Sequence, residues 1–431
     1  MNDMKYSKAN KSYSKKVRWH KRRAHYYRIA FIIVLIALAV TAIVICTKVL
    51  GKNQTTNTIA PTAESTYPQQ DSSRTADIPN IPEVQTLAQE VATETPVENE
   101  HEDEVIPQIY EGEFELPLQG ATVYTLANTS LYGESGDKKS VCAGTGLQII
   151  SEEDGKLTVK TDDGFTGIIN SYECMLNLPD VIPSIVYMDT NSSESLMMSS
   201  GYEIPSVTGK QLYDVEQYNQ RLGRTEFNMP IIFETAKKVM AAQKAALSEG
   251  YSLCIVETYR PLDTQRTISS NLKSLASSEP AVRNGIEGNG WGESWFIAQS
   301  VSNHQRGYAM DLTLVKVNET EICTSGNYAY VNVSKYEEVQ MPTQIHELSD
   351  ASIALAYGVK SSSATAWKEV PLASSMNDVA IRLQNYCVSA GFTPLASEWW
   401  HFNDLSAKNS SSGSLSNGEY SLQANLSIIP E

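Results

Sequence analysis

The sequence predicts an α+β fold for the C-terminal half of the chain, preceded by a small all-β barrel and a single N-terminal membrane-spanning helix. Three observations predict this order: an uncharged apolar run near the N-terminus, short β-type runs after a polar stretch, and then helical and strand patterns without a regular βαβ repeat. The chain has 431 residues, of which 41% are hydrophobic and 19% charged, enough for two or three folded units. This composition excludes collagen-like, wholly disordered and multi-span membrane proteins.

The N-terminal segment combines a basic stretch with an apolar run. Residues 1–28 hold ten Lys or Arg and one acidic residue, and the 19 residues 29–47 carry no charge. About 20 apolar residues span a bilayer as a helix. A cleaved signal peptide is the alternative, but the run is long, and Val44 and Ile45 before Cys46 do not favour cleavage. We expect one uncleaved helix in the cell membrane, with residues 1–28 in the cytoplasm and the rest of the chain outside.

A polar stretch follows the apolar run. Residues 48–112 are rich in Thr, Pro, Glu, Gln and Asn, and are expected to form a disordered linker because they cannot bury enough apolar surface. From residue 53 onward the chain carries 22 Lys or Arg against 49 Asp or Glu. No basic patch large enough for nucleic acid is left, so nucleic acid is not expected as a partner.

Residues 113–179 show the pattern of a small β barrel. Short β-type runs at residues 121–124, 146–150 and 156–160 are separated by Gly-containing turns. Residues 161–169, with the sequence TDDGFTGII, resemble the end of bacterial SH3-like wall-associated domains. Binding to the cell wall and a role as a spacer are both compatible with this resemblance.

Residues 180–405 mix helical and strand patterns. A helix is predicted over 231–249 with Gly250 as its stop, followed by a strand over 252–256. A second helix is predicted over 378–390 with Gly391 as its stop, leading to β-type runs at 392–395 and 397–402. Residues 406–431 are rich in Ser and Asn and are expected to form a loose tail.

Two histidines of this unit stand beside carboxylates. His304 opens a run that reaches Asp311, and His401 follows Glu398 by three residues. A catalytic zinc takes three protein ligands and keeps one position for water. His304, Asp311 and His401 are therefore the candidate ligands of one zinc ion, and Glu398 is the candidate base. No C-x-x-C pair supports a cysteine zinc site.

The spacing of these residues constrains their local structure. A turn at Gly307 that feeds a strand would bring His304 and Asp311 to one point. Glu398 and His401 would lie on opposite faces of a regular strand, so a bulge or bend is expected between them. The five cysteines after the membrane helix leave open free thiols or two pairs: Cys142 with Cys174, and two of Cys254, Cys323 and Cys387.

The motifs Ser-x-His-x-x-Gly-x-Ala-x-Asp, at residues 302–311, and Glu-x-x-His, at 398–401, resemble the zinc D-alanyl-D-alanine carboxypeptidases and D-Ala-D-Ala dipeptidases, which include vancomycin-resistance enzymes. The resemblance covers about residues 231–402. It implies zinc bound by His304, Asp311 and His401, with Glu398 as base and later proton donor. It also implies that Arg260 polarises the scissile carbonyl and that Ser302 lies near the substrate carboxylate.

One position departs from the dipeptidase pattern. The dipeptidases have Phe-Asp where this chain has Ile345-His346, and that Asp holds the free amine of the dipeptide. Together with the resemblance and the expected membrane helix, the sequence predicts an extracytoplasmic zinc peptidase that trims peptidoglycan stem peptides. Carboxypeptidase and dipeptidase action both remain open. The alternatives are an L,D-specific wall peptidase and a non-catalytic wall-binding protein that keeps the metal fold. His346 is expected at the pocket rim or the surface.

Overall fold

The computed structural model describes residues 107–431. The predicted cytoplasmic segment, the membrane helix over 29–47 and almost all of the linker lie outside these residues. Among the described helices, none has the length and apolar character needed to cross a membrane.

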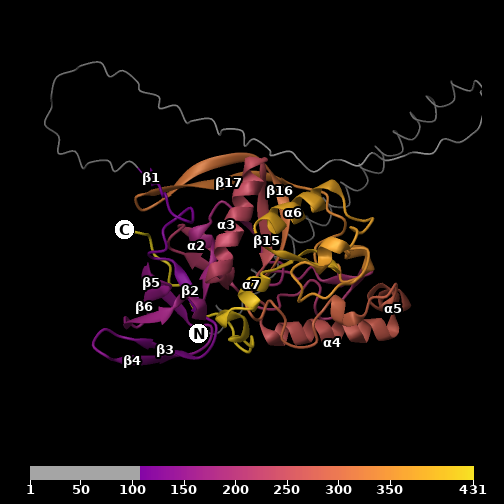
Figure 1. Ribbon diagram of the computed structural model, residues 1–431, viewed down its shortest axis with the longest axis horizontal. Helices are drawn as coiled ribbons and strands as arrows, with labels where there is room; N and C mark the ends of the chain where they lie inside the picture. The colour runs from indigo at the N-terminus through magenta and orange to yellow at the C-terminus, as the bar shows by residue number, and fades with distance from the viewer. Residues whose placement is uncertain (1–106) are drawn as a thin grey trace, which may run out of the picture. The chain divides into compact units, whose positions relative to one another are not determined.

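The β-rich segment predicted over residues 113–179 forms most of one eight-stranded sheet (Figure 1). In spatial order the strands are β14 (Pro230–Ile232), β8 (Cys174–Asn177), β2 (Thr122–Thr125), β5 (Gly146–Glu153), β6 (Lys156–Lys160), β7 (Thr166–Asn170), β3 (Thr129–Tyr132) and β4 (Lys138–Val141). The three β-type runs expected here are β2, β5 and β6. Because β14 belongs to the segment after residue 180 and pairs with β8, the β-rich segment and the following unit share a sheet.

A seven-stranded sheet organises the rest of the chain. Its main path is β1 (Gln108–Ile109), β17 (Tyr328–Glu338), β16 (Ala309–Ser325), β15 (Tyr251–Glu257) and β9 (Val186–Tyr187). The start of β16 also pairs with β19 (Glu398–Asn403), which pairs with β18 (Thr393–Leu395). The long hairpin of β16 and β17 runs along the top of Figure 1.

Two helices pack against the seven-stranded sheet. The helix expected over 231–249 is α3 (Phe233–Ser248), and the one expected over 378–390 is α6 (Asp378–Ser389). Gly250 and Gly391 take the left-handed conformation with φ of +78° and +95°, as expected of helix stops. The other helices are α2 (Leu178–Val181), α4 (Leu262–Ser278), α5 (Pro280–Glu287) and α7 (Leu405–Lys408).

Short elements complete the fold. Two two-stranded sheets are formed by β10 (Met198–Ser199) with β11 (Tyr202–Glu203), and by β12 (Glu216–Asn219) with β13 (Arg224–Phe227). Single 3₁₀ turns are η1 (Ser171–Glu173), η2 (Glu293–Trp295), η3 (Asp350–Ser352), η4 (Ala366–Glu369) and η5 (Ser411–Ser414). The five cysteines among residues 107–431 are free thiols, and Cys174, Cys254 and Cys387 are buried.

The C-terminal segment is bound to the body of the protein, in contrast to the loose tail expected over 406–431. Its backbone donates hydrogen bonds from Gln423 N to Gly144 O at 2.9 Å and from Ile428 N to Gly120 O at 2.8 Å. Gly418 O accepts from Leu262 N at 2.9 Å. Short polar side chains mark this segment as loop-forming, but its backbone groups find partners in the loops before β2 and β5 and at the start of α4.

Candidate metal centre

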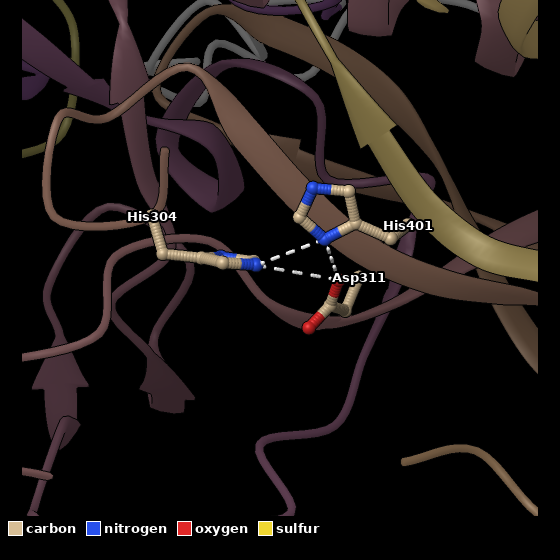
Figure 2. Close-up of side chains that lie close together, drawn as sticks. All are labelled: His304, Asp311 and His401. Atoms are coloured by element: carbon tan, nitrogen blue, oxygen red, sulfur yellow. Dashed lines mark hydrogen bonds and ion pairs between the residues drawn. The ribbon is translucent and has the colours of Figure 1, made fainter. Parts of the chain in front are cut away.

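Three side chains, two of them from strands β16 and β19, converge on one point (Figure 2). His304 Nε2 lies 3.2 Å from His401 Nδ1 and 3.4 Å from Asp311 Oδ1, and His401 Nδ1 lies 2.9 Å from the same oxygen. Zinc bonds of about 2.0–2.1 Å in a tetrahedron put ligand atoms roughly 3.3 Å apart. The three atoms therefore have the spacing of a facial set of zinc ligands.

The local backbone brings these ligands together as the spacing predicts. Gly307 has φ of +75° and donates its N–H to His304 O at 3.0 Å, and β16 then begins at Ala309. In the pairing of β16 with β19, Asp311 stands opposite His401. The expected bulge is confirmed: the register of β18 on β19 jumps from Phe402 to Glu398 within one residue of β18.

The hydrogen bonds of the two imidazoles leave their converging nitrogens as acceptors. His304 Nδ1 donates to Thr258 O at 2.8 Å, and His401 Nε2 donates to Asn403 Oδ1 at 3.0 Å. The facing Nε2 and Nδ1 then both carry lone pairs, beside a carboxylate. Such a buried set of three acceptors is stabilised by a cation, so the residues present fit a zinc ion.

Glu398 lies beside this set. Its Oε2 is 3.6 Å from His401 Nδ1, and its side chain is 9% exposed. Burial raises the pKa of Glu398 to about 8. A carboxyl group that exchanges a proton near neutral pH is suited to general acid–base work.

Arg260 is held by carboxylates on one side and faces the cavity on the other. Its Nε and Nη2 donate to Glu257, Nη2 also lies 3.3 Å from Asp311 Oδ2, and Nη1 donates to Gln265 Oε1 at 2.7 Å. A guanidinium has five N–H groups. One Nη1 hydrogen is left without a partner among the described residues, available to a ligand in the cavity.

Glu257 was not predicted from the sequence and anchors this arrangement. It is fully buried and accepts hydrogen bonds from Asn191 Nδ2 at 2.8 Å and Tyr213 OH at 2.7 Å, as well as from Arg260. Burial raises the pKa of Glu257, but the charge and hydrogen bonds of Arg260, together with His304 and His346, lower that pKa below its usual value. The ionised carboxylate keeps the guanidinium in place.

His346 lines the cavity, but it is buried instead of exposed at the rim or surface as expected. Its side chain is 1% exposed, and Nε2 donates to Asp311 Oδ2 at 3.1 Å, while Nδ1 lies 3.3 Å from Thr190 Oγ1. Its backbone has φ of +63°, a region that residues other than Gly seldom adopt. His346 thus orients the metal-ligand carboxylate from behind, with the oxygen Oδ1 of Asp311 left for the metal.

A second group of possible ligands is formed by Glu257, Asp311 and His346. Arg260 already bonds both carboxylates of this group, so its positive charge takes the place that a second metal would need. The site therefore fits a single metal ion.

The centre opens into a cavity of about 220 Å³. Ser302 lies in its wall, with its N–H bonded to Gln305 Oε1 at 2.7 Å and its Oγ 3.3 Å from His304 N. Trp295 and the buried Trp400 also line it. The structure thus brings together all six site residues expected from the sequence, and their individual roles remain predictions: His304, Asp311, His401, Glu398, Arg260 and Ser302.

Comparison with known families points to the same chemistry. Residues 206–415 match the family model described as D-Ala-D-Ala dipeptidase. At the level of the family, this match supports a zinc metallopeptidase that acts on substrates of the D-Ala-D-Ala type. No curated protein matches the chain. The family match does not extend over residues 113–179, so the SH3-like resemblance of that segment stays a prediction.

Proposed function

We propose that the protein is a membrane-anchored, extracytoplasmic zinc carboxypeptidase that removes the terminal D-Ala from peptidoglycan stem peptides. The observation that carries the choice of carboxypeptidase is the charge distribution of the cavity. Asp311 belongs to the ligand set and is also contacted by Arg260 and His346. Glu257 is surrounded by Arg260, Tyr213 and Asn191.

Among the described residues that line the cavity, Glu398 is then the one carboxylate that neither pairs with a cationic side chain nor belongs to the metal-ligand set. The free ammonium of a dipeptide would have to compete with water for Glu398, the proposed base. A longer peptide has an amide at that position and needs no counter-charge. The cavity therefore favours peptides that continue beyond the terminal pair.

The residues of the site fit the steps of peptide hydrolysis. A zinc ion held by His304, Asp311 and His401 would supply Lewis acidity. Glu398 accepts a proton from the attacking water and returns it to the leaving amine. Arg260 directs its remaining Nη1 hydrogen at the carbonyl oxygen, and the hydroxyl of Ser302 faces the terminal carboxylate.

Two matched substrates test the proposal. We expect an N-acylated peptide ending in D-Ala-D-Ala to be hydrolysed with kcat/KM at least about tenfold above that of free D-Ala-D-Ala, the cost of about 1.4 kcal/mol for an uncompensated ammonium. Faster hydrolysis of the free dipeptide would show a dipeptidase. Cleavage of an L–D bond with the D-Ala-D-Ala bond left intact would show the L,D-specific alternative.

We also propose a cellular location, supported by the sequence outside the described residues. The basic residues 1–28 and the uncharged run 29–47 support a single membrane helix with a cytoplasmic N-terminus. Protease added to intact cells should release the chain from the linker onward and leave residues 1–28 protected. Release of residues 1–28 without lysis would overturn this orientation.

A further inference from the structure

Three polar side chains form a chain of hydrogen bonds that ends on His401. Tyr308 OH donates to Asn303 Oδ1 at 2.9 Å, and Asn303 Nδ2 donates to Asn403 Oδ1 at 2.6 Å. The same Asn403 oxygen accepts from His401 Nε2 at 3.0 Å. Tyr308 and Asn403 are each 1% exposed, and Asn303 between them is partly exposed.

The direction of this chain fixes the tautomer of His401. Asn303 presents an N–H to Asn403, so Asn403 turns its oxygen toward both Asn303 and His401. An oxygen facing Nε2 requires the proton of the neutral imidazole to sit on Nε2. Nδ1 is then the unprotonated nitrogen, and it is Nδ1 that lies 2.9 Å from Asp311 Oδ1 in the ligand set.

We propose that Tyr308, Asn303 and Asn403 act as a relay of positioning residues that selects the metal-binding tautomer of His401. The relay joins both sequence motifs, since Asn303 precedes one ligand and Asn403 follows the other by two residues. None of the three belongs to the ligand set, although Asn303 lies in the cavity wall. The inference rests on the metal centre of the proposed function and adds residues that the ligand motif does not include.

The relay predicts opposite effects for the same chemical change at its two asparagines. In Asn403→Asp the carboxylate still accepts from His401 and Asn303, so the Nε2–H tautomer is kept. In Asn303→Asp the carboxylate cannot donate, and it draws the N–H group of Asn403 toward itself. Asn403 then presents N–H to His401 Nε2, which places the imidazole proton on Nδ1 and blocks the ligand nitrogen.

Zinc affinity of the full-length protein in detergent tests the relay, measured by competition with a chromogenic chelator. Asn403→Asp should bind zinc about as tightly as the wild type. Asn303→Asp and the similarly sized, acceptor-free Asn403→Leu should bind about ten- to hundredfold more weakly. Thermal unfolding in excess zinc checks that each variant folds, and the partly exposed Asn303 is the more tolerant position.

If the asparagines had a purely structural role, or if zinc binding depended on charge alone, the variants would rank differently in zinc affinity. A buried Asp at position 403 would be the more damaging substitution if Asn403 only packed, and an added carboxylate at position 303 would tighten zinc if only charge mattered. Wild-type affinity in Asn303→Asp or Asn403→Leu overturns the relay. A wild-type protein that binds no zinc would instead overturn the proposed function, so the two failures are distinguishable.

Discussion

Replacing Glu398 by Gln removes the proposed proton acceptor and leaves the three converging ligand atoms in place. Glu398 Oε2 lies 3.6 Å from His401 Nδ1, outside the set formed by His304, Asp311 and His401. The substitution changes an oxygen to an NH₂ group of nearly the same size. We expect the purified variant to keep one zinc ion per chain and its fold, and to lose turnover.

The expected loss follows from what a general base contributes. General acid–base groups supply about 10²–10⁴ in rate, or about 3–5 kcal/mol of activation free energy. Because Glu398 is expected to act twice, in water activation and in protonation of the leaving amine, the loss should reach at least this range. The KM should change little, since the carboxyl group is not proposed to hold the peptide.

Asp311→Asn is the matched variant with the opposite signature. Asp311 Oδ1 belongs to the ligand set, and Oδ2 is bonded by His346 and lies 3.3 Å from Arg260. Loss of this charge removes the only anionic ligand and leaves a buried guanidinium with one carboxylate fewer. We expect weaker zinc binding and a lower free energy of unfolding, by about 3–5 kcal/mol for a broken buried pair.

Both variants are compared in two measurements. Elemental analysis gives the zinc content, and release of D-Ala from a pentapeptide ending in D-Ala-D-Ala gives the turnover rate. A Glu398→Gln protein that retains zinc and turns over close to the wild-type rate would refute the assigned base. Loss of zinc from Glu398→Gln would show instead that Glu398 is a ligand.

Two further predictions concern stability. Gly418 has φ of +71°, and a Cβ there would overlap Gln305, so Gly418→Ala should lower the free energy of unfolding by about 1–3 kcal/mol more than Gly223→Ala, where φ is +66° and the space is open. Burial raises the pKa of Glu115 to about 7 despite its bonds from Ser184, so this group stabilises the fold below its unfolded value of 4.5 and loses that contribution as the pH rises through about 7. Glu115→Gln should therefore gain up to about 3 kcal/mol relative to the wild type between pH 5 and pH 8.

Chemical denaturation measures both effects. Equal losses in Gly418→Ala and Gly223→Ala would mean that the C-terminal segment is not packed on Gln305. A stability difference between Glu115→Gln and the wild type that stays constant from pH 5 to pH 8 would contradict the raised pKa of Glu115.

The metal centre was predictable because its ligands and its base lie within two short sequence motifs. Two turn and bulge features, at Gly307 and within 398–402, follow from the need to bring residues of odd spacing to one point. The helix stops at Gly250 and Gly391 were equally clear, because glycine adopts the left-handed conformation without strain.

The residues that support the centre were not predictable in the same way. Glu257 is the last residue of β15, one position beyond the strand predicted over 252–256, and its role depends on Arg260 folding back three residues later. His346 was assigned to the rim because its burial depends on contacts with Thr190 and Asp311, far away in sequence. The C-terminal segment appeared loose because its composition is polar, whereas its order comes from backbone hydrogen bonds to distant loops.

The most direct test of the account is mass spectrometry of an N-acylated pentapeptide ending in D-Ala-D-Ala after incubation with the zinc-loaded protein. We expect the loss of a single terminal D-Ala, no reaction with the peptide ending in L-Ala-L-Ala, and no reaction after the zinc is removed by a chelator. An intact D-Ala-D-Ala peptide in the presence of stoichiometric zinc, or equal cleavage of both stereoisomers, would contradict it.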